Sequence, residues 1–189
     1  SIDLLSASYV TEQVGIETSG SSPDFTREEF LAHAQVRVID IGGGIGVPDR
    51  HGGPAFDIAG LDAALRSIDS TKAGVELWME PGRYVVAEAG VLLAKVTQTK
   101  TKGAAGYVGV ATGMNSLIRP ALYGAHHDIV NLSRLAEATD GIFDVVGPIC
   151  ETGDVLGHDR ALPASTGEGD VLLIATAGAY GASMASNYN

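Results

Sequence analysis

Apolar runs alternate with helix-like segments in the first half of the chain. Residues 36–44 read VRVIDIGGG, a short apolar strand that runs into glycines, and residues 75–83 (VELWMEPGR) begin as a second buried strand. Between the two strands, apolar residues recur on one helical face, and a further helix is expected at TREEFLAHA, which begins at Thr26 close to a capping box. The face of the central helix consists of Ile58, Leu61, Ala64, Leu65 and Ile68. Strand, helix and strand in this order predict a parallel βαβ unit.

After about Val91 the pattern changes to short β-like runs. VLLAKVTQTKTK ends in an alternation of period two, with Val96, Gln98 and Lys100 on one side. GYVGVATG, FDVVGPI and GDVLLIATAGAY are further runs rich in Val, Ile and Tyr, bounded by Gly, Pro or Asp. We therefore expect an α/β domain over residues 1–91 and a mainly β domain over residues 92–189.

Composition excludes several functional classes. The chain has 189 residues and a formal net charge of −11, which argues against nucleic-acid binding. It contains no apolar run of about 18 residues, so no membrane span is expected. Cys150 is the only cysteine and cannot form an internal disulfide, which favours a cytoplasmic location. His126 and His127 are adjacent and point in different directions, so we expect no metal site.

Glycines directly after a parallel strand let backbone N–H groups approach an anion. Gly42, Gly43 and Gly44 are therefore either a phosphate site or a tight strand-to-helix turn.

The next strand ends in Glu80 and Arg83, separated only by Pro81 and Gly82. Arginine suits a phosphate or a carboxylate, and glutamate suits a protonated ring nitrogen or an amine. The alternative is a surface ion pair in a turn.

Further candidates follow in the β-rich half. Arg119 and Tyr123 are four residues apart and would share a face of a helical turn. Cys150 and Glu151 lie in a loop bounded by Gly and Pro, where a thiol is a candidate proton donor, although a lone cysteine is more often an apolar core residue. Glycines around Tyr180 suggest a phenol held close to a ligand.

Five motifs in order resemble the fold-type III pyridoxal-phosphate decarboxylases, and most closely the diaminopimelate decarboxylases: DIGGGIG, EPGRYVVAEAGVLLAKV, GMNSLIRPALY, GPICETGD and GAYGASMASNYN. The stretch EPGRYVVAEAGVLLAKVTQTK also resembles the decarboxylase part of fused aspartate kinase–diaminopimelate decarboxylase proteins. The resemblance implies that residues 1–91 are the C-terminal part of a (β/α)8 TIM-like barrel that binds the cofactor. Residues 92–189 would be a β-rich barrel or sandwich domain, incomplete at its end.

The resemblance also implies an activity, the decarboxylation of meso-2,6-diaminopimelate to L-lysine, the last step of lysine biosynthesis, with pyridoxal 5′-phosphate as cofactor. Cys150 matches the proton donor, which acts in the partner subunit's site, so a homodimer is implied. By resemblance, the cofactor-binding residues are Gly42, Gly43, Gly44, Glu80, Pro81, Gly82, Arg83 and Tyr180, and the substrate-binding residues are Arg83, Arg119, Tyr123, Glu151 and Tyr180.

Other functions stay open. A related decarboxylase of ornithine, arginine or carboxynorspermidine is one alternative, a non-catalytic regulatory relative is another, and an unrelated phosphate-binding barrel is a third. Three positions depart from the family pattern: Ala111 and Gly124 replace acidic residues, and Thr152 replaces a serine.

The lysine that binds the cofactor covalently in this family is not among the lysines of the chain, which are Lys72, Lys95, Lys100 and Lys102. A complete barrel also takes about 250 residues. We therefore expect a fragment that lacks the N-terminal half of the barrel and that has no decarboxylase activity on its own.

Overall fold

A computed structural model describes residues 38–48, 50–67, 76–103 and 105–189. The helix expected at Thr26 lies outside these residues. The chain divides into two units, of which the first comprises residues 1–39 and 70–76 and the second comprises residues 40–69 and 77–189. Most of the described residues belong to the second unit.

The elements of the expected βαβ unit occur in the predicted order. They are β1 (Val38–Asp40), α3 (Ile58–Ser67) and β2 (Glu76–Trp78), and β1 and β2 are neighbours in a two-stranded sheet. The Ile41 N–H donates to the Trp78 carbonyl at 2.9 Å, and the Glu80 N–H donates to the Gly42 carbonyl at 2.8 Å. These two bonds advance in the same direction along both segments, as in a parallel pair.

Little of a (β/α)8 barrel is evident in the described residues. In the part of the chain that the structure describes, two short strands and one ten-residue helix precede α5 (Gly82–Val86). The apolar pattern of α3 forms the predicted helix, but none of its residues is buried. An amphipathic helix of this kind normally packs its apolar face against other elements.

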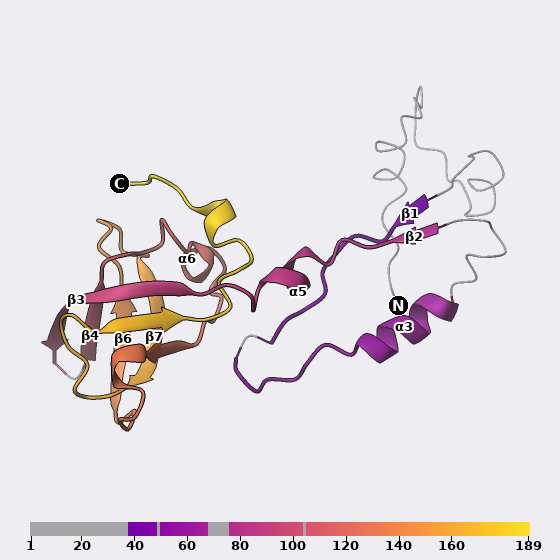
Figure 1. Cartoon of the computed structure of the whole chain (residues 1–189). Helices are drawn as coiled ribbons and strands as arrows, with labels where there is room; N and C mark the ends of the chain where they lie inside the picture. The colour runs from indigo at the N-terminus through magenta and orange to yellow at the C-terminus, as the bar shows by residue number, and fades with distance from the viewer. Residues whose placement is uncertain (1–37, 49, 68–75, 104) are drawn as a thin grey trace. The chain divides into compact units, whose positions relative to one another are not determined.

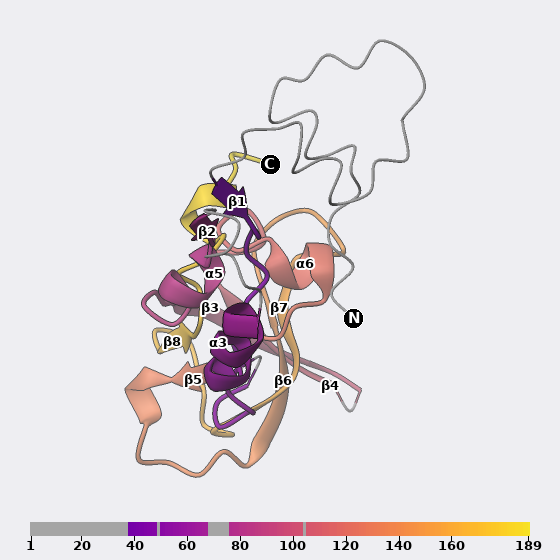
Figure 2. The ribbon, with the colours of Figure 1, turned by 90° about the vertical axis from the view of Figure 1, so that its right-hand side faces the viewer.

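A six-stranded sheet forms the C-terminal half (Figures 1 and 2). Its strand order is β5-β8-β3-β4-β6-β7, and all neighbours are antiparallel except β4 and β6, which are parallel. The edge strands β5 and β7 contact each other, so the sheet curls into a nearly closed barrel. The strands are β3 (Leu92–Lys102), β4 (Ala105–Val110), β5 (Ile129–Asn131), β6 (Gly141–Val146), β7 (Val155–Leu162) and β8 (Val171–Ile174). The remaining short helices are α6 (Arg119–Tyr123), η1 (Leu132–Arg134) and η2 (Ala182–Met184).

Aliphatic side chains from every strand of the six-stranded sheet fill the barrel interior, two from each of β3, β4, β7 and β8 and one from each of β5 and β6. On β3, Ala94 and Val96 are buried while Leu93 and Lys95 are exposed, as alternation predicts. The register shifts between Val96 and Gln98, and beyond that point both faces of β3 are exposed. The period-two pattern therefore predicted the strand correctly, but its buried side ends at Val96. The buried core comprises Ala94, Val96, Val108, Val110, Leu117, Ile129, Val145, Leu156, Leu162, Leu172 and Ile174.

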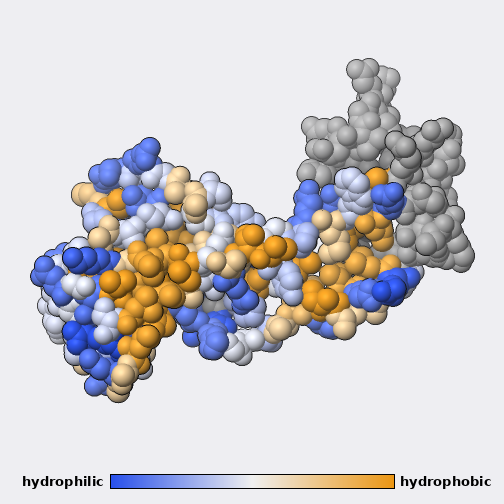
Figure 3. Space-filling model, viewed as in Figure 1, coloured by the Kyte–Doolittle hydropathy of each residue, from blue (hydrophilic) through white to orange (hydrophobic). Residues whose placement is uncertain are grey.

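An apolar row crosses the outer face of the sheet. Leu93 on β3 is opposite Leu173 on β8, which in turn is opposite Val130 on β5. Leu93 is 57% exposed and Val130 is 42% exposed, and Figure 3 shows a hydrophobic patch over this part of the sheet. Contiguous exposed apolar surface of this kind is typical of faces that are covered in an assembly.

The described helices include none that is both long enough and apolar enough to cross a lipid bilayer.

Asp170 ties the start of β8 to η1 through a buried carboxylate. Its Oδ2 accepts hydrogen bonds from Arg134 Nε at 2.6 Å, Asn131 Nδ2 at 3.0 Å and the Gly167 N–H at 3.0 Å. Burial alone would raise the pKa of Asp170, but these hydrogen bonds and the Arg134 charge outweigh it and hold the pKa below 3.8.

We expect Asp170→Asn to lower the free energy of unfolding at neutral pH by about 1–3 kcal/mol, because buried donors lose a charged acceptor. The carboxylate's contribution is present above the unfolded-state pKa of 3.8 and is lost as pH falls through the lower folded-state pKa. Urea unfolding at pH values from about 5 down to about 2 checks this. Equal acid sensitivity in the variant and the wild type would contradict it.

Candidate functional site

The glycines after β1 lie beside Glu80 at the end of β2. The Glu80 N–H donates to the Gly42 carbonyl at 2.8 Å, and the Gly42 N–H donates to Asp40 Oδ1 at 2.8 Å. Gly42 and Gly44 have φ angles of +72° and +83°, which side chains rarely adopt, and a Cβ on Gly43 would strike the Glu80 carbonyl oxygen. The predicted phosphate loop and the predicted partner of a ring nitrogen are therefore neighbours.

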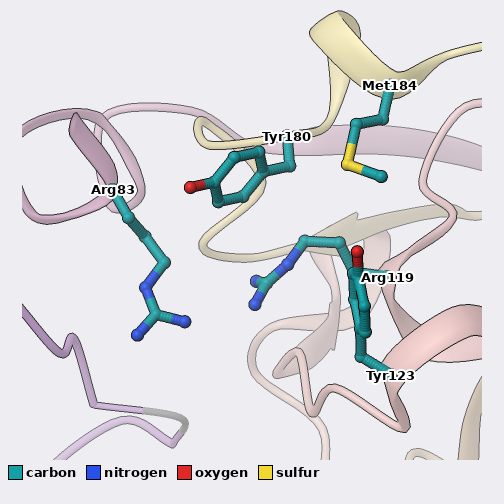
Figure 4. A pocket seen from close by; sticks show the side chains of 5 residues that line it. All are labelled: Arg83, Arg119, Tyr123, Tyr180 and Met184. Carbon is teal, nitrogen blue, oxygen red and sulfur yellow. The ribbon is translucent and has the colours of Figure 1, made fainter. Parts of the chain in front are cut away.

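A pocket of about 440 Å³ lies in the second unit, within the usual size range of small-molecule sites. In Figure 4 the guanidinium groups of Arg83 and Arg119 extend into the same space, and the ring of Tyr180 lies beside it. Four of the predicted site residues are thus brought together. The lining residues are Arg83, Arg119, Tyr123, Tyr180 and Met184.

Close backbone contact brings Arg83 and Tyr180 to one pocket. The Ala177 N–H donates to the Gly90 carbonyl at 2.8 Å, and the Gly178 N–H donates to the Ala87 carbonyl at 3.0 Å. A Cβ on Gly178 would strike the carbonyl of Val86, so only glycine permits this approach. The end of α5 is thereby held against the segment that leads into Tyr180.

Tyr180 itself has a φ angle of +63°, a strained conformation for a residue with a side chain. Ala179, directly before it, is buried, and this packing holds the conformation. Strain of this kind costs of order 1–3 kcal/mol and persists only where the surroundings impose it. The tyrosine is therefore held in place by the fold.

Arg119 and Tyr123 are presented by α6, one turn apart, as their spacing predicts. The buried Leu117 anchors the chain before the helix. Gly124 ends the helix with φ 62° and its N–H donates to the Pro120 carbonyl at 3.0 Å. A glycine is well suited to this left-handed cap, which accounts physically for the departure at position 124.

The pocket is cationic. The guanidinium carbon of Arg119 lies 5.7 Å from the centroid of the Tyr180 ring, a cation–π contact that orients the arginine. No carboxylate lines the pocket, and neither Arg83 nor Arg119 has an ion-pair partner among the described residues. Two unpaired guanidinium groups that face one space are suited to a carboxylate or a phosphate.

Cys150 and Glu151 lie elsewhere, in the loop between β6 and β7. Cys150 is exposed, and neither residue is among those that line the pocket. The Tyr188 hydroxyl donates to Glu151 Oε2 at 3.2 Å, and this carboxylate raises the pKa of Tyr188. Within one chain, Cys150 and Glu151 therefore do not line the pocket formed by the other predicted substrate residues.

His126 and His127 take part in separate interactions. His126 Nε2 lies 2.9 Å from Asp128 Oδ1, while Arg160 Nη1 donates to His126 Nδ1 at 2.7 Å. The His127 ring is buried, with Nδ1 2.9 Å from the carbonyl of Ala175. In the ranges that the structure describes, no group of three or more His, Cys, Asp or Glu is arranged to hold a metal ion.

Two residues at or near the site were missed by the sequence interpretation. Met184 lines the pocket, and Tyr188 contacts Glu151. Met184 lies four residues after Tyr180, a spacing that could have suggested a shared face. No local signal links Tyr188 to Glu151, because the contact joins distant segments.

Comparison with known proteins identifies the family. The model of the pyridoxal-dependent decarboxylase C-terminal sheet domain matches residues 24–178. The chain belongs to this family. The resemblance to fold-type III decarboxylases read from the motifs is thus confirmed.

Curated relatives of this family member are diaminopimelate decarboxylases. The protein from Haemophilus influenzae is 44% identical over 151 residues, covering 80% of this chain and 36% of its own length. The protein from Escherichia coli is 39% identical over 196 residues, covering 90% of this chain and 46% of its own length. The chain therefore spans less than half the length of these relatives.

Solved structures give the same picture. Diaminopimelate decarboxylase from M. jannaschii matches with a TM-score of 0.74 and 36% identity, covering 86% of this chain and 38% of that one. A structure titled SrLDC, in complex with PLP and cadaverine, matches with a TM-score of 0.66 and 28% identity, covering 79% of this chain and 39% of that one. The chain is therefore similar in structure to proteins that carry different titles.

We expect the stability of this domain to fall on mild acidification because of His127. Burial, followed by the positive charges of Arg119 and Arg160 and by His126, lowers its pKa below 6.5, although the hydrogen bond to Ala175 opposes this. The folded state holds the neutral ring, so stability is fully present above pH 6.5 and falls below it as the unfolded chain takes up the proton. His127→Asn should flatten the dependence of the unfolding free energy on pH just below 6.5. An unchanged slope in urea unfolding would contradict the assignment.

Proposed function

We propose that the chain is the C-terminal part of a pyridoxal-phosphate-dependent carboxy-lyase that converts meso-2,6-diaminopimelate to L-lysine. The observation that carries the proposal is the pocket in which Arg83 and Arg119 converge without any lining carboxylate. Diaminopimelate differs from the other candidate substrates by a second carboxylate at the end that does not react. Relatives about 40% identical are diaminopimelate decarboxylases, which supports this choice.

The residues present fit pyridoxal phosphate. Gly42 and Gly44 have open space where a Cβ would stand, so their backbone can approach a phosphate. Glu80 adjoins this loop through the backbone hydrogen bond from its N–H to Gly42. This supports a role for its carboxylate in keeping a ring nitrogen protonated. When bound, the cofactor draws electrons from the carbon that loses carbon dioxide.

The side chains of the chain would bind and orient the substrate. Arg83 and Arg119 hold the distal carboxylate, Tyr123 completes the wall on the α6 side, and Tyr180 borders both cofactor and substrate. Cys150 delivers a proton to the reacting carbon, and Glu151 binds the distal amino group. Pro81 and Gly82 direct Glu80 and Arg83 to their separate partners.

We further propose that the active enzyme is a cytoplasmic homodimer. Cys150 and Glu151 do not line the pocket of their own chain, which supports a site completed by the loop of a second copy. The barrel half that supplies the cofactor lysine would precede this chain in the complete polypeptide, with the domain boundary near residues 91 and 92. Residues 1–91 would then form the last part of the (β/α)8 barrel.

A decarboxylase of a single-carboxylate amino acid such as ornithine or arginine is the second candidate. Its support is the 28% identity to the structure titled SrLDC, solved with cadaverine. Such a substrate leaves Arg83 and Arg119 without an anion, so the cationic pocket favours diaminopimelate. A non-catalytic relative would not need Cys150 and Glu151.

We expect the complete polypeptide, incubated with pyridoxal phosphate, to show a visible cofactor absorbance that borohydride abolishes. It should release carbon dioxide from meso-diaminopimelate. Cys150→Ala should reduce kcat by roughly 100-fold or more, as for removal of a general acid, and leave the absorbance in place. Absence of the absorbance would overturn the enzyme assignment, and absorbance without lysine formation would overturn only the substrate.

We expect Arg119→Gln to raise KM for diaminopimelate roughly 10- to 100-fold, because a hydrogen-bonded charge pair with the distal carboxylate is lost. Arg66→Gln is the matched control, since Arg66 lies exposed on α3 and forms an ion pair with Asp62 in its own helix. Steady-state kinetics on both variants check this. An equal KM in Arg119→Gln and the wild type would remove Arg119 from the substrate site.

We expect the 189-residue chain alone to release no carbon dioxide from diaminopimelate, because it holds no lysine in the position that the cofactor requires. Release of carbon dioxide from labelled substrate by the purified chain would contradict this.

A further inference from the structure

Asp154 is a buried carboxylate that contacts two loops of the proposed site. It is 3% exposed and has no cationic partner among the described residues. Its Oδ1 accepts a hydrogen bond from the Met114 N–H at 2.6 Å, and its Oδ2 accepts one from the Ile149 N–H at 2.7 Å. A buried carboxylate is costly unless hydrogen bonds of this kind satisfy it, so the two loops and the carboxylate depend on one another.

The first loop leads to Arg119. From Met114 the chain turns through two hydrogen bonds to the Gly113 carbonyl, from the N–H groups of Ser116 at 2.9 Å and Leu117 at 3.2 Å. Leu117 enters the core, and α6 begins at Arg119. The tether at Met114 therefore sets where the helix that carries Arg119 begins.

The second loop carries Cys150 and Glu151. Ile149, which donates to Asp154, directly precedes Cys150. Asp154 also closes this loop through its own backbone, since its N–H donates to the Glu151 carbonyl at 3.1 Å and its carbonyl accepts from the Gly147 N–H at 3.0 Å.

Two glycines beside the Asp154 carboxylate leave it the space that a side chain would otherwise occupy. A Cβ on Gly113 or on Gly147 would fall directly onto the Asp154 carboxylate. Glycine at both positions lets the two loops approach the side chain closely, so the contact depends on three residues from two loops.

We propose that Asp154 is a positioning residue that sets the Arg119 loop and the Cys150–Glu151 loop in one arrangement. It touches neither substrate nor cofactor and acts through the substrate-binding arginine and the proton donor. The inference rests on the proposed function for its kinetic consequences. The tether itself can be tested without turnover.

The test is Asp154→Asn in the complete polypeptide. The amide has the size of the carboxylate but retains only one acceptor oxygen, so one of the two loops loses its hydrogen bond. We expect KM for diaminopimelate to rise and kcat to fall, each by roughly 10-fold, with the cofactor absorbance unchanged. The rate at which iodoacetamide alkylates Cys150, followed by mass spectrometry of its peptide, should change several-fold.

Asp170→Asn is the matched control. Asp170 is also a buried carboxylate that accepts a backbone N–H, but its partners lie on η1 and in the turn before β8. It should lower Tm and leave KM, kcat and the alkylation rate of Cys150 as in the wild type.

A double-mutant cycle separates positioning from general stability. If Asp154 acts through Cys150, Asp154→Asn should change kcat less than twofold in a Cys150→Ala background. Independent, multiplicative effects together with an unchanged alkylation rate would overturn the proposal. The complete polypeptide could also lack decarboxylase activity while Asp154→Asn still changes the alkylation rate of Cys150. That result would support the link between the two loops and reject only the proposed function.

If Asp154→Asn fails to fold, hydrogen exchange of the wild-type protein tests whether Asp154 holds the two loops. We expect the amides of Met114 and Ile149 to exchange at least 100-fold more slowly than unprotected amides. Exchange of either amide at the unprotected rate would overturn the proposal.

Discussion

The close backbone contact between residues 86–90 and residues 177–178 is the constraint on which the pocket depends. Two hydrogen bonds and a pair of facing glycines hold the end of α5 against the segment after β8. The contact continues the antiparallel pairing of β3 with β8, in which Leu92 is opposite Ile174. The segment before β3 and the segment after β8 therefore lie at the same end of the sheet. For this reason Arg83 and Tyr180, which are far apart in the sequence, line one pocket.

The barrel supplies a rigid apolar interior, while aspartates hold the loops at its ends. Asp154 accepts the Met114 N–H, and Asp128 accepts the His51 N–H. Asp170 accepts hydrogen bonds from the side chains of Arg134 and Asn131. Strands as short as the three-residue β5 leave long connections whose backbone groups need partners. Carboxylates meet this need with strong, charge-assisted hydrogen bonds. The pocket is the exception, since its charged groups are cations left free for a ligand.

Local patterns predicted most of the main elements correctly. The helix at α3 followed from apolar spacing, and β3, β4, β6 and β8 followed from runs of β-branched residues. The strands β5 and β7 were missed, because β5 is very short and β7 carries Gly157, His158 and Asp159 in its middle, with Asp159 at φ 53°. These two strands become neighbours when the barrel closes, and closure cannot be predicted from a local sequence pattern.

By itself, the sequence determined the family and the order of the main elements. Tertiary structure alone decided that Arg83, Arg119, Tyr123 and Tyr180 share a pocket and that Cys150 and Glu151 lie outside it. It also decided that Asp154 links two loops of the proposed site. The reason is that periodicity and capping arise from neighbours along the chain, whereas these arrangements arise from hydrogen bonds and packing between distant segments, which leave no local pattern.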